Sequence, residues 1–349
     1  MITVKLLSSR PVDEWRRYFP HEDCAWGACR FVFAREARDY DWLVVYDDVP
    51  PAAEGGRDDA CERLACPRAR TVLVTTEPES IKCYGRAFAA QFGHVLTSQP
   101  PWALPHPHHH WQQAANHWFY GSAPDACLDY AQMQAGPDWA EKRERLSVVH
   151  SQKCQWHTLH ARRFAFIETV RRALPEMAVY GRGWQPLGDK REALAPFRYH
   201  LAVENHVAPH HITEKLTDAF LGRCLPFYAG APNAADYFPA ESFIAIDLYR
   251  PRQAVDIIRE AIASGQWEKR REAIEAARER VLQHEHLFAV LERLVRTHPD
   301  DGTQAGAGEA LWGRHAWRRR HPVGALAHMG EKLYVRARSM LARGAKALR

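Results

Sequence analysis

The stretch Tyr199–Asp247, YHLAVENHVAPHHITEKLTDAFLGRCLPFYAGAPNAADYFPAESFIAID, decides the fold of this chain. An apolar strand over residues 201–203 ends in two polar residues, a loop follows, and Thr213 begins a helix with Lys215 in its first turn. The first N–H groups of a helix have no partner inside the helix, and the helix dipole places partial positive charge there. The stretch therefore predicts a strand-loop-helix site for an anion, strengthened by the amino group of Lys215.

Strands and helices alternate along both halves of the chain, which favours an α/β fold with parallel sheets. The first half contains the strand-like runs ITVKLL, RFVFA, DWLVVYDD, TVLVTT and HVLT. A second series starts at LSVVHS and continues through a helix, MAVYG, the quoted stretch and FIAID. These two series predict two Rossmann-like domains facing a cleft. The N-terminal, acceptor-binding domain is expected over 1–145, the C-terminal, donor-binding domain over 146–300, and a linker with a basic helical tail over 301–349.

The quoted stretch also contains a family motif. It holds E-N-x(6)-I-T-E-K, from Glu204 to Lys215, followed by an apolar helix, L-P-F-Y-A-G, a proline-containing loop and S-F-I. This pattern resembles the C-terminal signature of the family 10 fucosyltransferases, over roughly residues 146–260. The resemblance implies a bacterial member with the GT-B fold. It also implies an inverting enzyme that moves L-fucose from GDP-fucose to a hydroxyl of a glycan acceptor.

One arginine of the second domain is expected to contact the diphosphate of the nucleotide sugar. A cation at the start of a helix opposes the dipole unless an anion sits between them, which favours Arg163, with Arg162 as the competing candidate. The family carries V-S-N followed by R-x-x-F-[VI]-E, with the arginine on the diphosphate. The resemblance also implies donor contacts at Ser151 and Gln152, although His150-Ser151-Gln152 stands in place of V-S-N.

Polar residues of the quoted stretch complete the expected donor site. Glu204 ends a buried strand and should hydrogen-bond to the backbone or to a ribose hydroxyl, with Asn205 as a donor contact, unless the two are a purely structural pair. The resemblance implies that Glu214 accepts hydrogen bonds from hydroxyls of the ribose or the sugar. His200 and His211 depart from the aromatic or amide residues frequent in the family, so another GDP-sugar stays open as the donor.

No cofactor is expected to be required. Arg163, Lys215 and the helix start at Thr213 supply positive potential that could stabilise a departing nucleoside diphosphate without a metal. The adjacent pairs Asp47-Asp48 and Asp58-Asp59 lack the intervening residue of an Asp-x-Asp metal motif. The donor site is therefore predicted to act without a divalent ion.

The general base for the acceptor hydroxyl is expected from the first domain. The strand TVLVTT runs into Glu77 and Glu79, and the C-terminal end of a parallel strand is where α/β sheets present ligands. The family has an acid here, often as T-G-E-N, which corresponds to residues 75–78. Glu77 is the first candidate for the base and Glu79 the second. The alternative is that both are loop acids near a helix start.

The histidine run HPHHH at residues 106–110 raises the question of a metal. No i, i+4 histidine pair with a carboxylate accompanies it, so we expect an acceptor-side loop and no catalytic metal. Two further function classes stay open. A nucleotide-sugar or glycan binder could keep the pocket without turnover, and a metal-dependent hydrolase built on the histidines is the weaker hypothesis.

The basic charge is concentrated in the tail. Residues 311–349 contain ten Lys/Arg and one acidic residue, so the preceding residues carry a small net negative charge within the overall +5. Such a body does not suggest nucleic-acid binding. After Pro322 the tail predicts an amphipathic helix, with Leu326, Met329 and Leu333 against basic residues. This helix suits an anionic membrane face, with a partner helix or disorder as the alternative.

The expected location follows from the same features. No apolar run approaches the length of a membrane span, and the N-terminus lacks a signal-peptide pattern. We expect a cytoplasmic protein, peripheral on the inner membrane face, with a nucleotide sugar and a glycan acceptor such as lipopolysaccharide as its partners.

Overall fold

The structure is a computed structural model that describes residues 1–52, 56–115, 117–123, 126–150, 159–298 and 305–347. The chain divides into two compact units, Met1–Ala114 with Phe288–Arg349 and Ala115–Leu287. The first unit is thus built from both ends of the chain. The predicted boundaries lie elsewhere, at 145/146 and 300/301.

Packing explains where the boundaries of the two units fall. Lys142 is buried, and its amino group donates to the carbonyl oxygens of Leu194 at 3.1 Å and Phe197 at 2.5 Å, which ties the segment before the second sheet to that sheet. At the other boundary, Phe288 packs on Phe19 with ring centroids 4.4 Å apart, inside the first unit. These contacts join distant positions, so strand and helix patterns alone do not show them.

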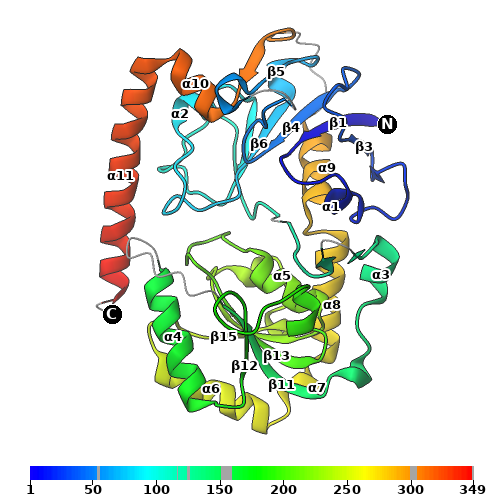
Figure 1. Cartoon of the computed structure of the whole chain (residues 1–349), viewed down its shortest axis with the longest axis vertical. Coiled ribbons are helices and arrows are strands. Elements are labelled where there is room, and N and C mark those ends of the chain that lie inside the picture. Colours follow the sequence, from blue (N-terminus) through cyan, green and yellow to red (C-terminus); the bar gives the residue numbers. More distant parts are fainter. Residues whose placement is uncertain (53–55, 116, 124–125, 151–158, 299–304, 348–349) are drawn as a thin grey trace. The chain divides into compact units, whose positions relative to one another are not determined.

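The first unit contains a seven-stranded sheet with the order β2-β3-β1-β4-β6-β7-β8, in which every pair except β2–β3 is parallel. Its strands are β1 Ile2–Leu7, β2 Ala25–Trp26, β3 Cys29–Val32, β4 Trp42–Tyr46, β6 Thr71–Val74, β7 His94–Thr97 and β8 His109–Trp111. Its shorter helices are α1 Asp13–Arg16 and α2 Arg86–Ala89, and α9 Leu287–Thr297 enters from the boundary (Figure 1). Strands β4 and β6 are buried along their whole length, as in parallel sheets covered on both faces.

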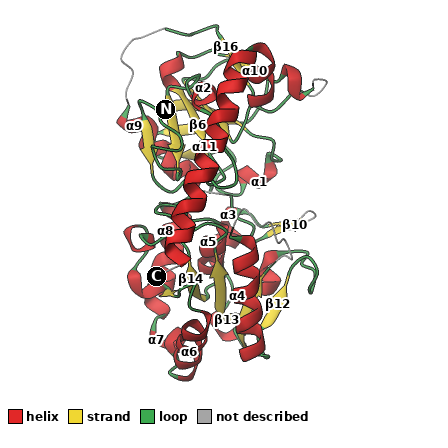
Figure 2. Cartoon of the chain, turned by 90° about the vertical axis from the view of Figure 1, so that its left-hand side faces the viewer, coloured by secondary structure: helices red, strands yellow, loops and turns green. Residues whose placement is uncertain are grey.

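The second unit contains a five-stranded, fully parallel sheet with the order β12-β11-β13-β14-β15. Its strands are β11 Glu144–Val149, β12 Ala178–Tyr180, β13 Phe197–Val203, β14 Leu225–Ala229 and β15 Ile244–Ala245, with a separate pair β9 Ser122–Ala123 and β10 Ala126–Cys127. Its helices are α3 Tyr130–Ala135, α4 His160–Ala173, α5 Glu214–Leu221, α6 Pro251–Ala263, α7 Gln266–Lys269 and α8 Arg271–Gln283 (Figure 2).

Helices cover both faces of the second sheet. Apolar residues of α4 and α6, among them Phe166 and Ile258, form one core with Leu201 and Val203 of β13, while α5 packs with α8. Because neighbouring strand residues point to opposite faces, His200 and Ala202 lie on the α5 side. Both sheets therefore have the doubly wound arrangement of Rossmann-like domains, which confirms this part of the predicted fold.

The beginning of the basic tail is part of the first unit. Strand β16 Ala310–Trp312 pairs antiparallel with β5 Cys61–Arg63, and α10 Arg314–Arg320 follows it. Leu311 on β16 is 1% exposed and joins the apolar core with Leu43 and Leu73. Residues 305–320 are therefore a structural part of this unit, and only the last helix stands out from it.

The last helix, α11 Pro322–Ala347, is amphipathic and begins at Pro322 as predicted. One face packs on the first unit, where Val335 is buried and Glu331 accepts a hydrogen bond from the Arg86 backbone N–H at 3.1 Å. The other face leaves Leu326 and Leu333 each 69% exposed. Within the described part of the chain, no helix is both long and apolar enough to cross a membrane.

A core substitution in β16 tests whether the tail stabilises the first unit. We expect Leu311→Ala to lower the free energy of unfolding by about 2–5 kcal/mol, because it removes a fully buried side chain and leaves a cavity. The matched control Leu326→Ala, on the exposed face of α11, should change it by less than about 0.5 kcal/mol. Urea unfolding of the full chain measures both, and equal values would contradict the assignment.

Candidate functional site

The candidate site lies at the carboxyl edge of the second sheet, where β11 and β13 are neighbours. The chain passes from β11 to β12 on one side and then crosses to β13 on the other side. Open α/β sheets bind ligands outside the carboxyl ends of their strands at such a reversal. His150 directly follows β11 and Glu204 directly follows β13, so both strand ends present polar side chains at this point.

Glu204 is fully buried and holds the turn into α5. Its carboxylate accepts a hydrogen bond from the Thr213 backbone N–H at 2.9 Å and one from the Thr213 hydroxyl at 2.7 Å. Burial raises the pKa of Glu204, and the cation of Lys215 opposes that shift. The sequence allowed Glu204 to hydrogen-bond either to the backbone or to a ribose hydroxyl. In the structure it accepts from the backbone of Thr213.

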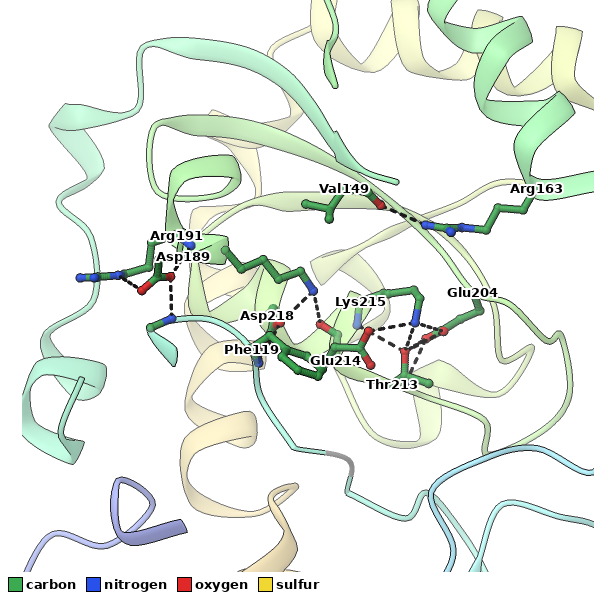
Figure 3. Close-up of polar contacts among 12 residues, drawn as sticks. Phe119, Val149, Arg163, Asp189, Arg191, Glu204, Thr213, Glu214, Lys215 and Asp218 are labelled. Atoms are coloured by element: carbon green, nitrogen blue, oxygen red, sulfur yellow. Dashed lines mark hydrogen bonds and ion pairs between the residues drawn. The ribbon is translucent and has the colours of Figure 1, made fainter. Parts of the chain in front are cut away.

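The amino group of Lys215 lies between two carboxylates (Figure 3). It is 2.9 Å from Glu214, 3.0 Å from the Thr213 hydroxyl and 3.4 Å from Glu204. Although burial opposes the charge, Glu214 and Glu204 raise the pKa of Lys215. Burial also opposes ionisation of Glu214, but Lys215 and Lys190 lower its pKa to about 2. Lys215 and Glu214 are therefore both charged at neutral pH.

The N–H groups at the start of α5 are satisfied by the chain itself. Thr213 donates to Glu204, the Glu214 N–H bonds to its own carboxylate, and the Lys215 N–H is capped by the Thr213 hydroxyl at 3.4 Å. This arrangement corrects the expectation that the helix start offers open N–H groups to an anion. The protein's own carboxylates occupy that place, and they also neutralise Lys215.

At this edge of the second sheet, Arg163 is a cation with unused hydrogen-bonding capacity. It lies in the first turn of α4, is buried, and donates from Nη2 to the Val149 carbonyl oxygen at 3.0 Å (Figure 3). Its buried Nε has no hydrogen-bond partner among the described residues. Burial lowers the pKa of Arg163 to about 10, so it stays charged at neutral pH. Arg162, the competing candidate, is exposed and lies 4.5 Å from the ring of Tyr249.

Two more polar side chains at the strand ends have unused atoms within the part of the chain described. His150 is buried with neither ring nitrogen hydrogen-bonded, and burial together with the nearby Arg163 lowers its pKa to about 4. The buried Oδ1 of Asn205 also lacks a partner. Buried polar atoms without partners cost free energy, so this edge suits a polar ligand. Sequence reasoning missed His150, although a polar residue directly after an apolar strand was the available signal.

The two unusual histidines of the motif lie inside the packed domain. His200 stands in the middle of β13, 2% exposed, with Nδ1 2.8 Å from the Ser147 hydroxyl on β11. His211 is buried and meets the ring of His206 edge to face, with centroids 5.4 Å apart. Burial keeps the pKa of both His200 and His211 well below the usual value, so both are neutral near pH 7.

Lys190 and Asp218 form a second buried ion pair beside the site, which sequence reasoning also missed. The Lys190 amino group is 2.8 Å from Asp218, whose carboxylate also accepts from the Phe119 backbone N–H at 3.2 Å. Burial raises the pKa of Asp218, and Lys190 opposes that shift. The signal was Asp218 itself, four residues after Glu214 on the same helix face.

The remaining predicted residues lie outside the described part of the second unit or in the first unit. Ser151 and Gln152 lie outside the described residues. Glu77 and Glu79 belong to the first unit and follow the carboxyl end of β6. Glu77 is exposed and its carbonyl accepts from the Gln99 amide at 2.8 Å, whereas Glu79 is 7% exposed.

Comparison with known proteins identifies the segment that carries this site. Residues 139–264 match the family model described as glycosyltransferase family 10 (fucosyltransferase), C-terminal part. The chain is 32% identical over 72 residues to an alpha-(1,3)-fucosyltransferase of Helicobacter pylori, covering 20% of this chain and 15% of that protein. It is 35% identical over 89 residues to a 4-galactosyl-N-acetylglucosaminide 3-alpha-L-fucosyltransferase of Pongo pygmaeus, covering 24% of each. The matches thus span less than a quarter of the length of these relatives.

Solved structures show a more distant likeness over more of the chain. A crystal structure of an alpha1,3-fucosyltransferase covers 82% of this chain and 91% of its own, with 14% identity and a TM-score of 0.46. A crystal structure of an alpha1,3-fucosyltransferase with GDP-fucose covers 82% of this chain and 92% of its own, with 14% identity and a TM-score of 0.44. The family match covers β11 to α6, the segment that supplies Arg163, Asn205 and Lys215. Residues 139–264 of this chain thus resemble the C-terminal part of glycosyltransferase family 10 (fucosyltransferase).

Proposed function

We propose that this protein transfers L-fucose from GDP-fucose to a hydroxyl of a glycan acceptor, with inversion at the anomeric carbon. The observation that supports the proposal most directly is the buried, charged Arg163, whose Nε has no partner among the described residues. A buried guanidinium of this kind is a site for a phosphate or carboxylate group. It lies in the segment that matches the fucosyltransferase family, and the relatives found there are named as fucosyltransferases.

The donor is held by the residues at the carboxyl edge of the second sheet. Arg163 contacts the diphosphate, and His150 beside it can donate a further hydrogen bond. Glu214, which Lys215 keeps ionised, accepts hydrogen bonds from sugar or ribose hydroxyls. The free Oδ1 of Asn205 accepts from an N–H or O–H of the nucleotide. Thr213 and Glu204 fix the helix on which Glu214 and Lys215 stand.

The transfer itself is a single displacement. The acceptor oxygen forms a bond to the anomeric carbon of fucose while the bond from that carbon to the phosphate oxygen breaks. A carboxylate takes the proton of the acceptor hydroxyl, and the leaving GDP takes the bonding electrons, which Arg163 stabilises. Glu77 is the proposed base, because it is the exposed acid of the pair, and Glu79 is the second candidate. We propose that no metal ion takes part in this step.

A glycan at a membrane is the proposed acceptor. Four of the exposed apolar side chains of α11 are defined here as the α11 stripe: Leu326, Met329, Leu333 and Met340. Their spacings of three, four and seven residues place them on one helix face, next to basic residues such as Lys332 and Arg336. A basic amphipathic helix binds an anionic membrane face. We therefore propose a cytoplasmic protein that meets lipid-linked acceptors, such as lipopolysaccharide precursors, at the membrane.

A binder without turnover is the second candidate function. The observation that favours it is the closed start of α5, where Glu204 and Glu214 occupy N–H groups that an anion would otherwise use. Titration with GDP-fucose, GDP-mannose and GDP by calorimetry, together with GDP release in the presence of varied glycan acceptors, separates the two. Selective binding of GDP-fucose with release supports the transferase, and binding without release on any acceptor supports the binder.

Arg163 tests the donor site. We expect Arg163→Met to weaken GDP-fucose binding by about 10- to 100-fold, because a charge-assisted hydrogen bond to phosphate contributes about 1.5–3 kcal/mol. The neighbouring control Arg162→Met should bind like the wild type, since Arg162 is exposed and stacked on Tyr249. Calorimetry measures both affinities. If Arg162→Met weakens GDP-fucose binding and Arg163→Met does not, the phosphate contact belongs to Arg162.

The base assignment has its own test. We expect Glu77→Gln to lower kcat by about 10²- to 10⁴-fold while the affinity for GDP-fucose is unchanged, because an amide cannot accept the proton. Glu79→Gln is the matched comparison. A large fall in kcat for Glu79→Gln alone would make Glu79 the base, and full activity in both variants would remove the two acids from the mechanism.

The α11 stripe tests the membrane proposal without cutting into the first unit. We expect the double variant Leu326→Asp with Leu333→Asp to lose most of its binding to vesicles that contain anionic lipid, because charges replace two exposed apolar contacts. Circular dichroism and GDP-fucose affinity should be those of the wild type. Sedimentation with vesicles measures the partitioning, and equal partitioning of variant and wild type would contradict the proposal.

A further inference from the structure

Three histidines from distant positions meet in the first unit. His94 begins β7, His110 lies in β8, and His298 directly follows α9. Each histidine contributes one ring nitrogen to the group, and these three nitrogens all lie within 4.8 Å of one another. His94 Nδ1 and His110 Nε2 are only 3.0 Å apart, and the His298 ring stands at steep angles to both, with centroids 4.6 and 5.3 Å away.

Hydrogen bonds to the backbone orient two of these rings. His298 Nδ1 lies 2.8 Å from the Leu294 carbonyl oxygen, which can only accept, so Nδ1 carries the proton and Nε2 carries the lone pair. His94 likewise has a hydrogen bond with the backbone of Ala69 in addition to its contact with His110. Histidines that ligate metals commonly give their second ring N–H to a backbone carbonyl in this way, which fixes the ring and the tautomer.

A histidine binds a metal ion through the lone pair of an uncharged ring. Burial, with repulsion from His298 and His110, lowers the pKa of His94 to about 3. Burial likewise lowers the pKa of His110 to about 4. No carboxylate belongs to the group that could hold an ion here. Ring nitrogens of the three histidines therefore converge on one point. The proton in the 3.0 Å contact between His94 and His110 would leave when an ion binds.

We propose that His94, His110 and His298 bind one zinc ion. Three imidazole nitrogens suit zinc and similar first-row ions, whereas magnesium and calcium prefer oxygen ligands. Zn–N bonds of about 2.0–2.1 Å in a tetrahedron place ligand nitrogens roughly 3.4 Å apart. The His94–His110 pair, at 3.0 Å, already has nearly this spacing. The third ring nitrogen lies within 4.8 Å of both, so closing each separation by up to about 1.4 Å would complete the set. A water molecule can take the fourth position.

The proposed ion would fasten the end of α9 to the edge of the sheet. The start of α9 is anchored by Phe288, whose ring packs on Phe19 and Phe31 at 4.4 and 4.8 Å between centroids. At the end of α9, His298 contacts His94 and His110, and residues 299–304 lie outside the described part of the chain. Zinc would thus join residues 94 and 110 to residue 298, and so hold the returning chain in the first unit. This role is structural and takes no part in the transfer step.

The site also explains part of the histidine run that the sequence presented. Of HPHHH at 106–110, only His110 belongs to the group. His109 points to the opposite face of β8, and the His108 ring packs beside His94 with centroids 5.0 Å apart. The partners His94 and His298 are far away along the chain, so no spacing rule for metal motifs would have found them. A structural zinc ion at this place does not conflict with the prediction that the histidine run holds no catalytic metal.

The test uses the full-length protein stripped of metal with a chelator and then dialysed, without donor or acceptor. We expect zinc chloride to bind at one equivalent per chain, measured by atomic emission, and to raise Tm by several degrees, about 3–8 °C, by mass action. Cobalt(II) should give the visible absorption of a tetrahedral site, while magnesium and calcium should change nothing. Failure of micromolar zinc to bind would overturn the proposal, whatever the transferase assays show.

Variants locate the ion. His110→Ala and His298→Ala should each lose the bound zinc and the rise in Tm while keeping the wild-type circular dichroism without metal. The matched control His109→Ala, one position along β8, should keep both. Cys83→Ser tests the rival group Cys83, His328 and Glu331 and should also keep the zinc. Zinc retained in His298→Ala, or lost only in Cys83→Ser, would show that the histidine site is wrong.

Discussion

The second unit depends on the amino group of Lys215, held between the carboxylates of Glu204 and Glu214. Removing one partner from a buried ion pair typically costs about 3–5 kcal/mol, because the remaining charge has no compensation. Here Lys215 serves two buried acids at once, one at the end of β13 and one on α5. The cluster therefore joins strand, loop and helix into one rigid edge, and it keeps Glu214 ionised.

Within that edge, anion recognition is built differently from what the motif suggests. The motif places a lysine at a helix start, which reads as a phosphate site. In the folded chain the protein's own carboxylates satisfy both the lysine and the first N–H groups. Three other side chains have a buried polar atom with no partner among the described residues: His150 after β11, Asn205 after β13, and Arg163 in the first turn of α4. The lysine orders this edge, and the proposed phosphate contact falls to the arginine.

The first unit also combines strands that the local sequence predicts with segments that come from far along the chain. Its sheet follows from the apolar strands of the first hundred residues, but its completion depends on chain that returns after the second unit. Phe288, Leu311 and Val335 are all buried in it, and each comes from the C-terminal part. A tail that composition marks as basic and separate thus contributes β16 and α10 to the unit, and only one face of α11 is left for another surface.

The sequence by itself determined the α/β class, the strand-loop-helix from Leu201 to Leu221 and the resemblance to the family 10 fucosyltransferases, because these rest on local periodicity and on contiguous motif residues. It also identified Arg163, Glu204, Glu214 and Lys215 as the polar residues of the site. The tertiary structure decided how those charges are shared, that His200 lies in the packed sheet, and that His150, Lys190 and Asp218 belong to the same edge. It also decided the unit boundaries and the meeting of His94, His110 and His298. Those features depend on which strand lies beside which, and strand order arises from packing between segments far apart in the chain.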